Sequence, residues 1–251
     1  MANTSLLNLD GAAAAYAVRL RLGPAPGDAP PLDAAALTTA DGVARAMEGL
    51  MARHAGRDRR AVASLWTKHY VAAVLSAPLA ALAWTGAGPL APAAASQIDV
   101  GADGLPTALR LPSVRLAEGE TALAALFGDH LALVFAAVGG VAGLSLRVMW
   151  SNAGNLAAHL LDCLEQAPAA PATVAPLRRA LLEPQHVSWA GGTNPLRTPV
   201  TWLTLAESGL PPRIHRRRVC CLRHRLGMTE CYSCPRLSEA ERKSVLRQRA
   251  S

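Results

Sequence analysis

The chain is poor in aromatic residues, in charged residues and, among its basic residues, in lysine. Of its 251 residues, 4% are aromatic, 17% are charged and 51% are apolar, and only Lys68 and Lys243 among the 25 basic residues are lysines. So large an apolar fraction excludes intrinsic disorder of the whole chain, and the low charge, without a long heptad pattern, excludes a coiled coil. Five cysteines are too few, and odd in number, for a disulfide scaffold. We therefore expect a folded chain with a substantial core.

The N-terminus lacks the basic segment and the apolar run of a secretory signal. Two uncharged stretches must be weighed as membrane spans. Residues 71–98 are interrupted by Pro78, Pro89 and Pro92, and residues 131–146 fall short of the ~20 residues that cross the hydrocarbon core. We expect both to be core helices and connectors. The expected location is the cytoplasm, with room for weak contact with the inner-membrane surface.

Apolar residues at helical spacing predict a mostly helical fold, with helices over residues 33–54, 62–75, 121–137 and 144–164 and a short one over 177–182. Pro78 is expected to end or kink the second helix, and Gly139-Gly140 to end the third. Residues 97–111 predict a short β-hairpin, and residues 184–212 are expected to be mostly irregular. The pair Ser238 and Glu241 predicts the start of a C-terminal helix. The expected fold class is α+β, predominantly α-helical.

The positive charge of the chain lies at its C-terminal end. Residues 211–251 carry 11 Lys and Arg against 3 Asp and Glu, whereas residues 1–210 carry 14 against 15. Four of the five cysteines lie in the same basic segment. We therefore expect a mostly helical domain over residues 1–205 and a small C-terminal module with a basic tail over residues 206–251.

The four cysteines of this segment, Cys220, Cys221, Cys231 and Cys234, have the spacing C-C-x9-C-x2-C. In a chain without an export signal, such a cluster indicates a metal site before a disulfide, because four soft thiolates complete a tetrahedral or iron–sulfur ligand set. The adjacent pair must lie in a turn or at a helix start, since neighbouring side chains of a strand point to opposite faces. Gly227 would let the intervening loop fold back.

Zinc sites generally use C-x2–4-C at both ends, so the adjacent pair favours a two-iron centre over zinc. Structural zinc and reactive dithiols or disulfides are the alternatives. His215 and His224 flank the cysteines and could replace a ligand, although hydrogen bonding or proton uptake is the expected role with four cysteines present. Cys163 lies among leucines at helical spacing, and we expect it to be a buried structural thiol.

The C-terminal run resembles that of the FhuF-like ferric-siderophore reductases, whose motif C-C-x10-C-x2-C binds a [2Fe–2S] cluster. The similarity covers the basic residues before the first pair, Cys-Cys-Leu-Arg, and Cys-Tyr-Ser-Cys-Pro. This chain has one residue fewer between its second and third cysteines. Elsewhere it resembles the family in its length, in the terminal position of the cysteines and in a Trp-x-Asn-x-Gly-Asn stretch (Trp150, Asn152, Gly154, Asn155).

The resemblance implies a reductase that passes one electron from a cytoplasmic donor, through a [2Fe–2S] cluster on the four cysteines, to Fe(III) in a siderophore, with hydroxamate chelates as the expected type. Iron would then leave as Fe(II). Basic residues near the cysteines would stabilise the thiolates and attract an anionic iron complex or an acidic donor; these are Arg216, Arg217, Arg218, Arg223 and Arg225. Trp189, Asn194 and Arg197, with Arg216 to Arg218, are the candidate substrate-binding residues.

Two other functions fit parts of the sequence. A basic tail shaped by zinc or an iron–sulfur cluster could belong to a redox-responsive nucleic-acid-binding regulator. The near-neutral residues 1–210 and the lack of a helix-turn-helix argue against nucleic acid as a partner. A siderophore-binding or storage protein with a structural metal is the third interpretation.

Overall fold

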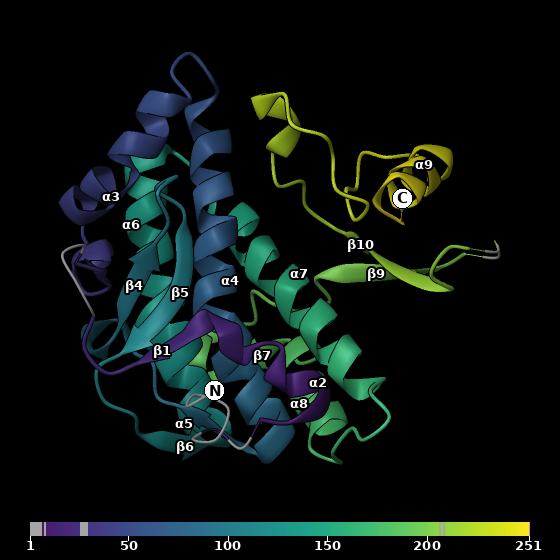
Figure 1. Cartoon of the computed structure of the whole chain (residues 1–251), viewed down its shortest axis with the longest axis horizontal. Coiled ribbons are helices and arrows are strands. Elements are labelled where there is room, and N and C mark those ends of the chain that lie inside the picture. The colour runs from purple at the N-terminus through teal and green to yellow at the C-terminus, as the bar shows by residue number, and fades with distance from the viewer. Residues whose placement is uncertain (1–6, 8, 26–29, 206, 208, 251) are drawn as a thin grey trace.

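The computed structural model describes residues 7, 9–25, 30–205, 207 and 209–250. Its core lies between four long helical elements and one small sheet (Figure 1). The helices that carry most of the buried residues are α3 (Ala40–Arg53), α4 (Arg59–Thr85), α6 (Leu133–Ala142) and α7 (Leu146–Glu165). The fold is α+β and predominantly helical, which confirms the predicted class.

Helix α4 runs through the middle of the molecule and packs along α7 (Figure 1). It begins after Asp58, whose side chain accepts a hydrogen bond from the backbone N–H of Arg60, and ends at Gly86, which has a left-handed φ of 82°. Pro78 is predicted to end or kink this helix; it does not end it, because α4 continues to Thr85. Proline in a helix interior costs about 3 kcal/mol, and almost complete burial of the residues around Pro78 offsets that cost.

A four-stranded sheet lies against α4. Its order is β1-β5-β4-β2, with β1 parallel to β5 and the other neighbours antiparallel. The predicted hairpin is confirmed as β4 and β5, which pair Ile98 with Leu109. The strands are β1 (Leu20–Leu22), β2 (Leu32–Asp33), β4 (Gln97–Val100) and β5 (Pro106–Leu111); a separate pair joins β3 (Ala87–Pro89) to β6 (Leu116–Glu118).

Short helical elements connect these parts. They are α2 (Gly11–Ala14), η1 (Ala17–Arg19), η2 (Ala36–Thr38) and η3 (Ala93–Ala95).

One continuous helical stretch runs from Gly119 to Ala142 and comprises α5 (Gly119–Leu123), the π-helical η4 (Ala124–Ala132) and α6. The predicted end at Gly139-Gly140 is wrong; the stretch ends at Gly143, whose φ of 64° provides a left-handed C-cap. By length and composition this stretch alone among the described residues could cross a membrane, and 56% of its most apolar window is buried inside the structure.

The segment after α7 contains more regular structure than the sequence predicts. Helix α8 (Val174–Leu182) begins three residues before its expected start. The stretch predicted to be irregular contains β7 (His186–Val187), η5 (Ser188–Ala190), β8 (Gly192–Thr193) and β9 (Val200–Thr204). These strands have only two to five residues, and pairing with a neighbouring strand, as between β7 and β8, stabilises them more than any local sequence pattern.

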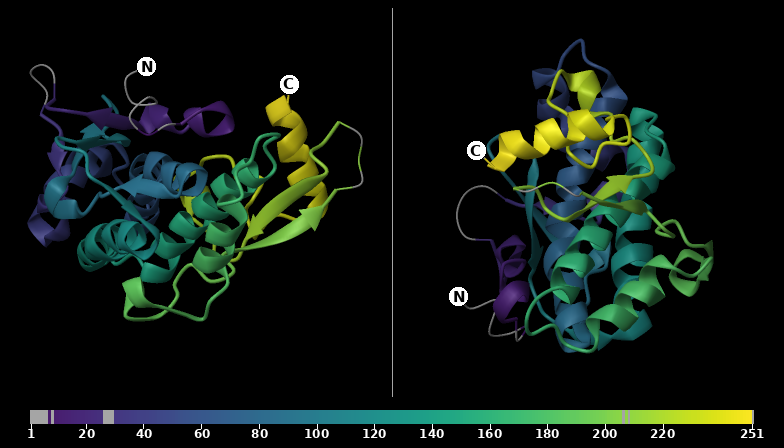
Figure 2. Two further views of the ribbon diagram at one scale, coloured as in Figure 1. Left: turned by 90° about the horizontal axis from the view of Figure 1, so that it is seen from below. Right: turned by 90° about the vertical axis from the view of Figure 1, so that its right-hand side faces the viewer.

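Strand β9 pairs antiparallel with β10 (Arg213–Arg217), which η6 (Arg223–Leu226) and α9 (Glu239–Ala250) follow. Figures 1 and 2 show this C-terminal part at one end of the helical body, beside α7 and the first half of α4. The predicted capping box is confirmed: the backbone N–H of Ser238 donates to Glu241 Oε2 (2.8 Å), and that of Glu241 donates to Ser238 Oγ (3.3 Å).

A buried histidine in the π-helical η4 makes stability depend on pH. His130 Nδ1 lies 2.7 Å from the carbonyl oxygen of Ala91, and Nε2 lies 2.6 Å from Tyr70 Oη. Because a carbonyl only accepts, Nδ1 carries the proton and Nε2 accepts from Tyr70. Burial lowers the pKa of His130 from 6.5 to about 4, so the folded state holds this ring neutral.

We therefore expect the free energy of unfolding to fall as pH decreases from about 6.5 to about 4. Over this range His130 binds a proton in the unfolded chain but stays neutral in the folded protein. The fall should be about 1.4 kcal/mol per pH unit for this group. Denaturant unfolding at several pH values measures it. His130→Gln should flatten the dependence, whereas the exposed His186→Gln should not; an equal slope in all three proteins contradicts the assignment.

Candidate metal centre

The cysteine loop, which we define as residues 218–235, connects β10 to the segment before α9. Cys220 and Cys221 lie outside any strand, in irregular backbone that leads through Leu222 into the 3-10 turn η6, and not within a turn or helix start as predicted. Leu222 adopts a φ of 62°, which is uncommon for a residue other than glycine, and Gly227 ends η6 with a φ of 71°. The chain thus reverses direction on both sides of η6, as predicted for Gly227.

The four predicted ligands lie together in one cluster. Cys221, Cys231 and Cys234 are buried and in contact, with the half-buried Cys220 packed against them. The thiols act on one another's pKa in two pairs, Cys221 with Cys231 and Cys220 with Cys234. Each pair joins one cysteine of the adjacent pair to one cysteine of the C-x2-C pair, so the loop folds as the spacing requires.

Hydrogen bonds and burial separate the pKa values of these thiols. The contact with Cys221 and a hydrogen bond from Ser233 Oγ (3.5 Å) lower the pKa of Cys231 to about 5. The same contact, followed by burial, raises the pKa of Cys221, and burial raises that of Cys234. The backbone N–H of Leu222 donates to Cys220 Sγ (3.4 Å). The loop therefore provides donors to two of the four sulfurs, as anionic sulfur ligands require.

The arrangement among the described residues is not a finished metal site, because no three His, Cys, Asp or Glu side chains among them already converge as ligands of one ion. All four thiols are free of disulfides. Four thiols in one contact cluster nevertheless match the donor chemistry of a sulfur-ligated centre.

Two buried arginines beside these thiols strengthen that match. Arg217 and Arg242 are only 2% and 1% exposed. Arg217 acts electrostatically on Cys221 and Cys231, and Arg242 on Cys231 and Cys234.

Neither arginine forms an ion pair with a carboxylate in the described part of the chain. Arg242 donates to the carbonyl oxygens of Tyr232, Cys234 and Leu237, and Nε of Arg217 has no partner. By contrast, the third buried arginine, Arg110, pairs with Asp99 at 2.8 Å. Buried charges are normally compensated, so the two arginines indicate an anionic group at the sulfurs.

A buried polar network attaches the cysteine loop to the helical body. Arg217 Nη2 donates to Asn152 Oδ1 (2.6 Å) and to Ser151 Oγ (3.3 Å). Asn152 Nδ2 donates to the carbonyl oxygen of Ser64 (3.4 Å), and Ser64 Oγ donates to that of Cys221 (2.8 Å). The network therefore connects α7, α4, β10 and the loop.

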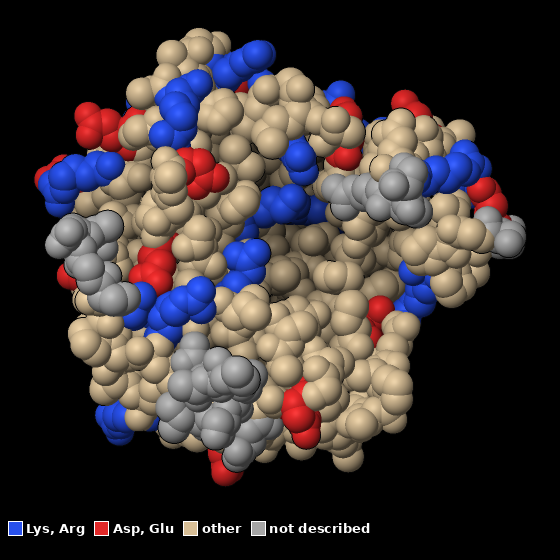
Figure 3. All heavy atoms as spheres, viewed as in Figure 1, with Lys and Arg blue, Asp and Glu red and all other residues tan. Residues whose placement is uncertain are grey.

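Basic side chains also surround the loop at the surface. Figure 3 shows Lys and Arg gathered around a hollow between the helical body and the C-terminal part. Lys68 on α4 contributes to the lowered pKa of Cys231. Arg225 pairs with Asp58 at the start of α4, and Arg223 is half-buried.

The predicted substrate-binding residues have different surroundings. Arg218 and Arg197 line a pocket of about 370 Å³ that reaches Val219 at the start of the cysteine loop, and Trp189 lines an adjoining one of about 250 Å³. Arg216 is exposed on β10, outside both pockets. Asn194 is buried and bonds to the carbonyl oxygens of Leu181 and Pro184 and to the N–H of Leu196, so its contacts are those of a loop-shaping residue.

The Trp-x-Asn-x-Gly-Asn stretch connects the pocket to the network. Trp150 lines the pocket, and Asn152 holds Arg217. A Cβ on Gly154 would lie 2.6 Å from Cβ of Pro199, which lines the pocket, so only glycine at this position lets the chain around Pro199 pack on α7. Asn155 is half-buried, and its Oδ1 has no partner in the described chain.

Three residues beside the thiols and the pocket were missed by the sequence analysis: Lys68, Arg147 and Arg242. Lys68 is far in sequence from the thiols, so only the fold brings it there, and the burial of Arg242 likewise depends on the fold. Position 242 fell on the helix predicted from the capping box, which gave no signal that one of its arginines is buried.

The flanking histidines and Cys163 have separate surroundings. His224 Nδ1 lies 3.7 Å from Cys220 Sγ, whereas His215 packs on the rings of His159, Trp202 and Tyr232. Cys163 is exposed, so its prediction as a buried thiol is wrong. The neighbouring leucines of α7 face the core, whereas position 163 faces the other side.

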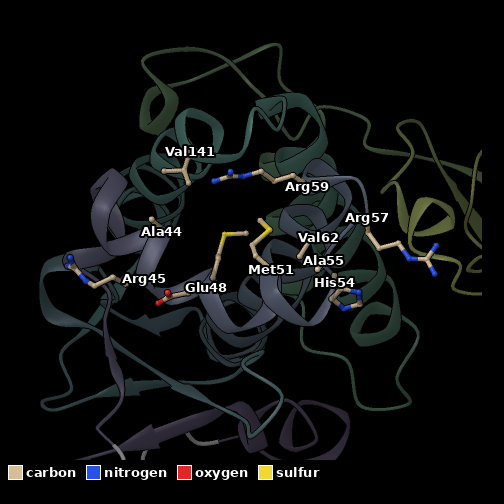
Figure 4. A pocket seen from close by; sticks show the side chains of 12 residues that line it. Ala44, Arg45, Glu48, Met51, His54, Ala55, Arg57, Arg59, Val62 and Val141 are labelled. Carbon is tan, nitrogen blue, oxygen red and sulfur yellow. The ribbon is translucent and has the colours of Figure 1, made fainter.

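A larger pocket of about 540 Å³ lies between α3, the start of α4 and α6 and contains none of the cysteines. Figure 4 shows Met51 directed into it and Arg57 directed away from it, toward the C-terminal part of the chain. The Arg57 guanidinium lies close to Gly227. Because the thiols lie elsewhere, we assign this pocket no part in the candidate centre.

A model of the family described as ferric iron reductase FhuF-like transporter matches residues 64–209, which is more than half of the chain. The chain belongs to this family. The match confirms the resemblance drawn from the sequence and supports a ferric iron reductase as the coarse function of this FhuF-like protein. The matched residues include Ser64, α7 and the pocket residues 195 and 197–199 but end before the cysteine loop. A search of curated proteins finds no match.

Removing the central amide of the network should loosen the cysteine loop. Asn152→Ala deletes the acceptor of the buried Arg217 guanidinium, and a hydrogen bond to a charged group contributes about 1.5–3 kcal/mol. We expect faster modification of the thiols by an aromatic disulfide reagent in the metal-free protein, together with a loss of stability of that size. Gln166→Ala, an exposed residue at the C-terminal end of the same helix, should leave both quantities unchanged. Unaltered thiol reactivity in Asn152→Ala contradicts the role of the network.

Proposed function

We propose that this FhuF-like protein is a cytoplasmic ferric-siderophore reductase whose Cys220, Cys221, Cys231 and Cys234 hold a [2Fe–2S] cluster. One electron from a cytoplasmic donor converts siderophore-bound Fe(III) to Fe(II). Oxygen chelators hold Fe(II) far more weakly, so iron leaves as Fe(II) and the free siderophore dissociates. Membership of the family supports the function of a ferric iron reductase and implies a ferric siderophore as the substrate. When bound, the cluster supplies reversible storage of one electron.

The observation that carries the proposal is the pair of buried arginines without carboxylate partners beside four clustered thiols. Arg217 and Arg242 approach the sulfurs from β10 and from α9. A centre of four thiolates with bound metal carries net negative charge, which these guanidinium groups would compensate. Their fixed charge would also favour the reduced, more negative state.

Three further features of the chain would support a cluster at the four cysteines. Burial of Cys221, Cys231 and Cys234 keeps water from most of the sulfurs. The N–H of Leu222 and the hydroxyl of Ser233 orient Cys220 and Cys231. These contributions require no covalent bond between protein and substrate, because electron transfer needs only proximity of the iron chelate to the centre.

The test is replacement of one proposed ligand. Cys231→Ser should lose bound iron, acid-labile sulfide and the visible absorption that dithionite bleaches, after anaerobic reconstitution. It should also lose release of Fe(II) from ferric siderophores, measured with a chelator that traps Fe(II). Cys163→Ser is the matched control, because Cys163 is exposed and outside the cluster; it should retain all of these properties.

A colourless protein that holds one zinc ion would contradict the proposal and favour a structural site or the regulator. Retention of sulfide and turnover in Cys231→Ser would contradict the ligand assignment alone. Iron and sulfide content separates these two outcomes before any substrate is added.

A further inference from the structure

A basic pocket lies against the cysteine loop. We use this name for the pocket of about 370 Å³ that contains Val219, the residue before Cys220. Its walls come from the first turns of α7, from the segment before β9 and from the start of the cysteine loop; they are Arg147, Trp150, Ser151, Pro195, Arg197, Thr198, Pro199, Arg218 and Val219. Its volume is within the range of small-molecule sites, about 300–1,000 Å³.

The charge of this pocket is of one sign. Arg147, Arg197 and Arg218 line it, and no Asp or Glu of the described chain does. Arg147 and Arg197 are exposed, and their side chains have no hydrogen bond or ion pair with another described residue, whereas Arg218 donates to Thr198. Arg147 also lies in the first turn of the 20-residue α7, whose N-terminus adds positive potential. The pocket therefore lacks an internal counter-charge.

Aromatic side chains continue the pocket on one side. Trp150 and Pro195 are shared with the adjoining pocket of about 250 Å³, which Trp189 also lines. Trp150 packs edge-on against Phe135 (ring centroids 5.0 Å apart) and lies 5.9 Å from Trp189. These rings form a firm apolar wall, so the two pockets together suit a ligand with a planar or apolar body and an anionic part.

The basic pocket is built into the same elements as the candidate centre. Pro199 packs directly on Gly154 of α7, and Thr198 adopts a φ of 42°, which is strained for a β-branched residue. Ser151 connects the pocket to the network, since its Oγ lies 3.5 Å from the carbonyl oxygen of Val219 and accepts from Arg217. A ligand in this pocket would therefore contact the start of the cysteine loop at Arg218 and Val219, the residues that precede Cys220 in sequence.

We propose that the basic pocket binds the ferric chelate and selects chelates with net negative charge, in which catecholate or carboxylate oxygens hold Fe(III). This inference rests on the proposed function and specifies its substrate class. Three singly charged hydroxamates neutralise Fe(III), which would leave three arginines without a counter-charge, whereas three doubly charged catecholates give a trianionic complex. The pocket thus favours anionic chelates over the hydroxamate type expected from the sequence.

The experiment measures binding without reduction, using Ga(III) in place of Fe(III), because Ga(III) has the same charge and accepts no electron. The probes are Ga(III) tricatecholate, a trianion, and a neutral Ga(III) trihydroxamate, titrated into the full-length protein by calorimetry or by tryptophan fluorescence. We expect the trianion to bind at least about tenfold more tightly, a difference of ~1.4 kcal/mol. Its affinity should fall with added salt, since exposed charges are screened.

The double variant Arg147→Gln, Arg197→Gln should weaken binding of the trianion by about tenfold or more and leave that of the neutral complex unchanged. Both residues are exposed, so the fold should be preserved, and circular dichroism checks this. Arg179→Gln, an exposed arginine of α8 outside the pockets, is the control and should change neither affinity.

Equal affinity of the wild type for the two probes, or an unchanged trianion affinity in the double variant, would overturn the inference. The inference would also fail if the double variant bound the trianion normally but accepted electrons from its donor more slowly. The two arginines would then bind the electron donor and not the chelate. The affinities for the Ga(III) probes do not depend on iron or sulfide content, so this inference can fail while the proposed function stands.

Discussion

The hydrogen bond between the buried guanidinium of Arg217 and the side-chain oxygen of Asn152 is the contact on which the candidate centre depends. It is short, 2.6 Å, and both partners are buried. Through Asn152 and Ser64 it continues to the carbonyl oxygen of Cys221. The loop itself has little regular structure, so its position relative to the helical body is determined by such contacts. A buried guanidinium without a partner would be costly. Arg217 therefore favours the one position of the loop in which Asn152 accepts its hydrogen bond.

The same side chain determines the electrostatics of the sulfurs. Arg217 uses neutral partners, so its positive charge is not cancelled within the helical body, and Arg242 does the same from the other side with backbone carbonyls. A cationic environment stabilises thiolates and the reduced form of a sulfur-ligated centre. Arg217 therefore both holds the cysteine loop in position and supplies positive charge to the sulfurs. A substitution that moves its guanidinium alters both.

The sequence predicts the elements whose signals are local. The capping box at Ser238, the hairpin around Ile98 and Leu109, and the turn at Gly227 each depend on a few adjacent residues, and the structure confirms them. Pro78 misleads because burial from distant residues outweighs its local cost. Strand β9 and the burial of Arg217 could not be predicted, since each depends on a partner elsewhere in the chain: β10 for the strand, and Asn152 for the arginine, which the sequence presents as one of three equivalent basic residues.

Helix α7 shows why the region matched by the family and the cysteine loop outside it must act together. Trp150 and Gly154 are four residues apart and so lie on one face, where the first lines the basic pocket and the second admits Pro199. Ser151 and Asn152, between them, bond to Arg217. Four of the five residues 150–154 therefore shape the pocket or hold the loop. A shift of this turn would therefore move both the wall of the pocket and the network that holds the cysteine loop.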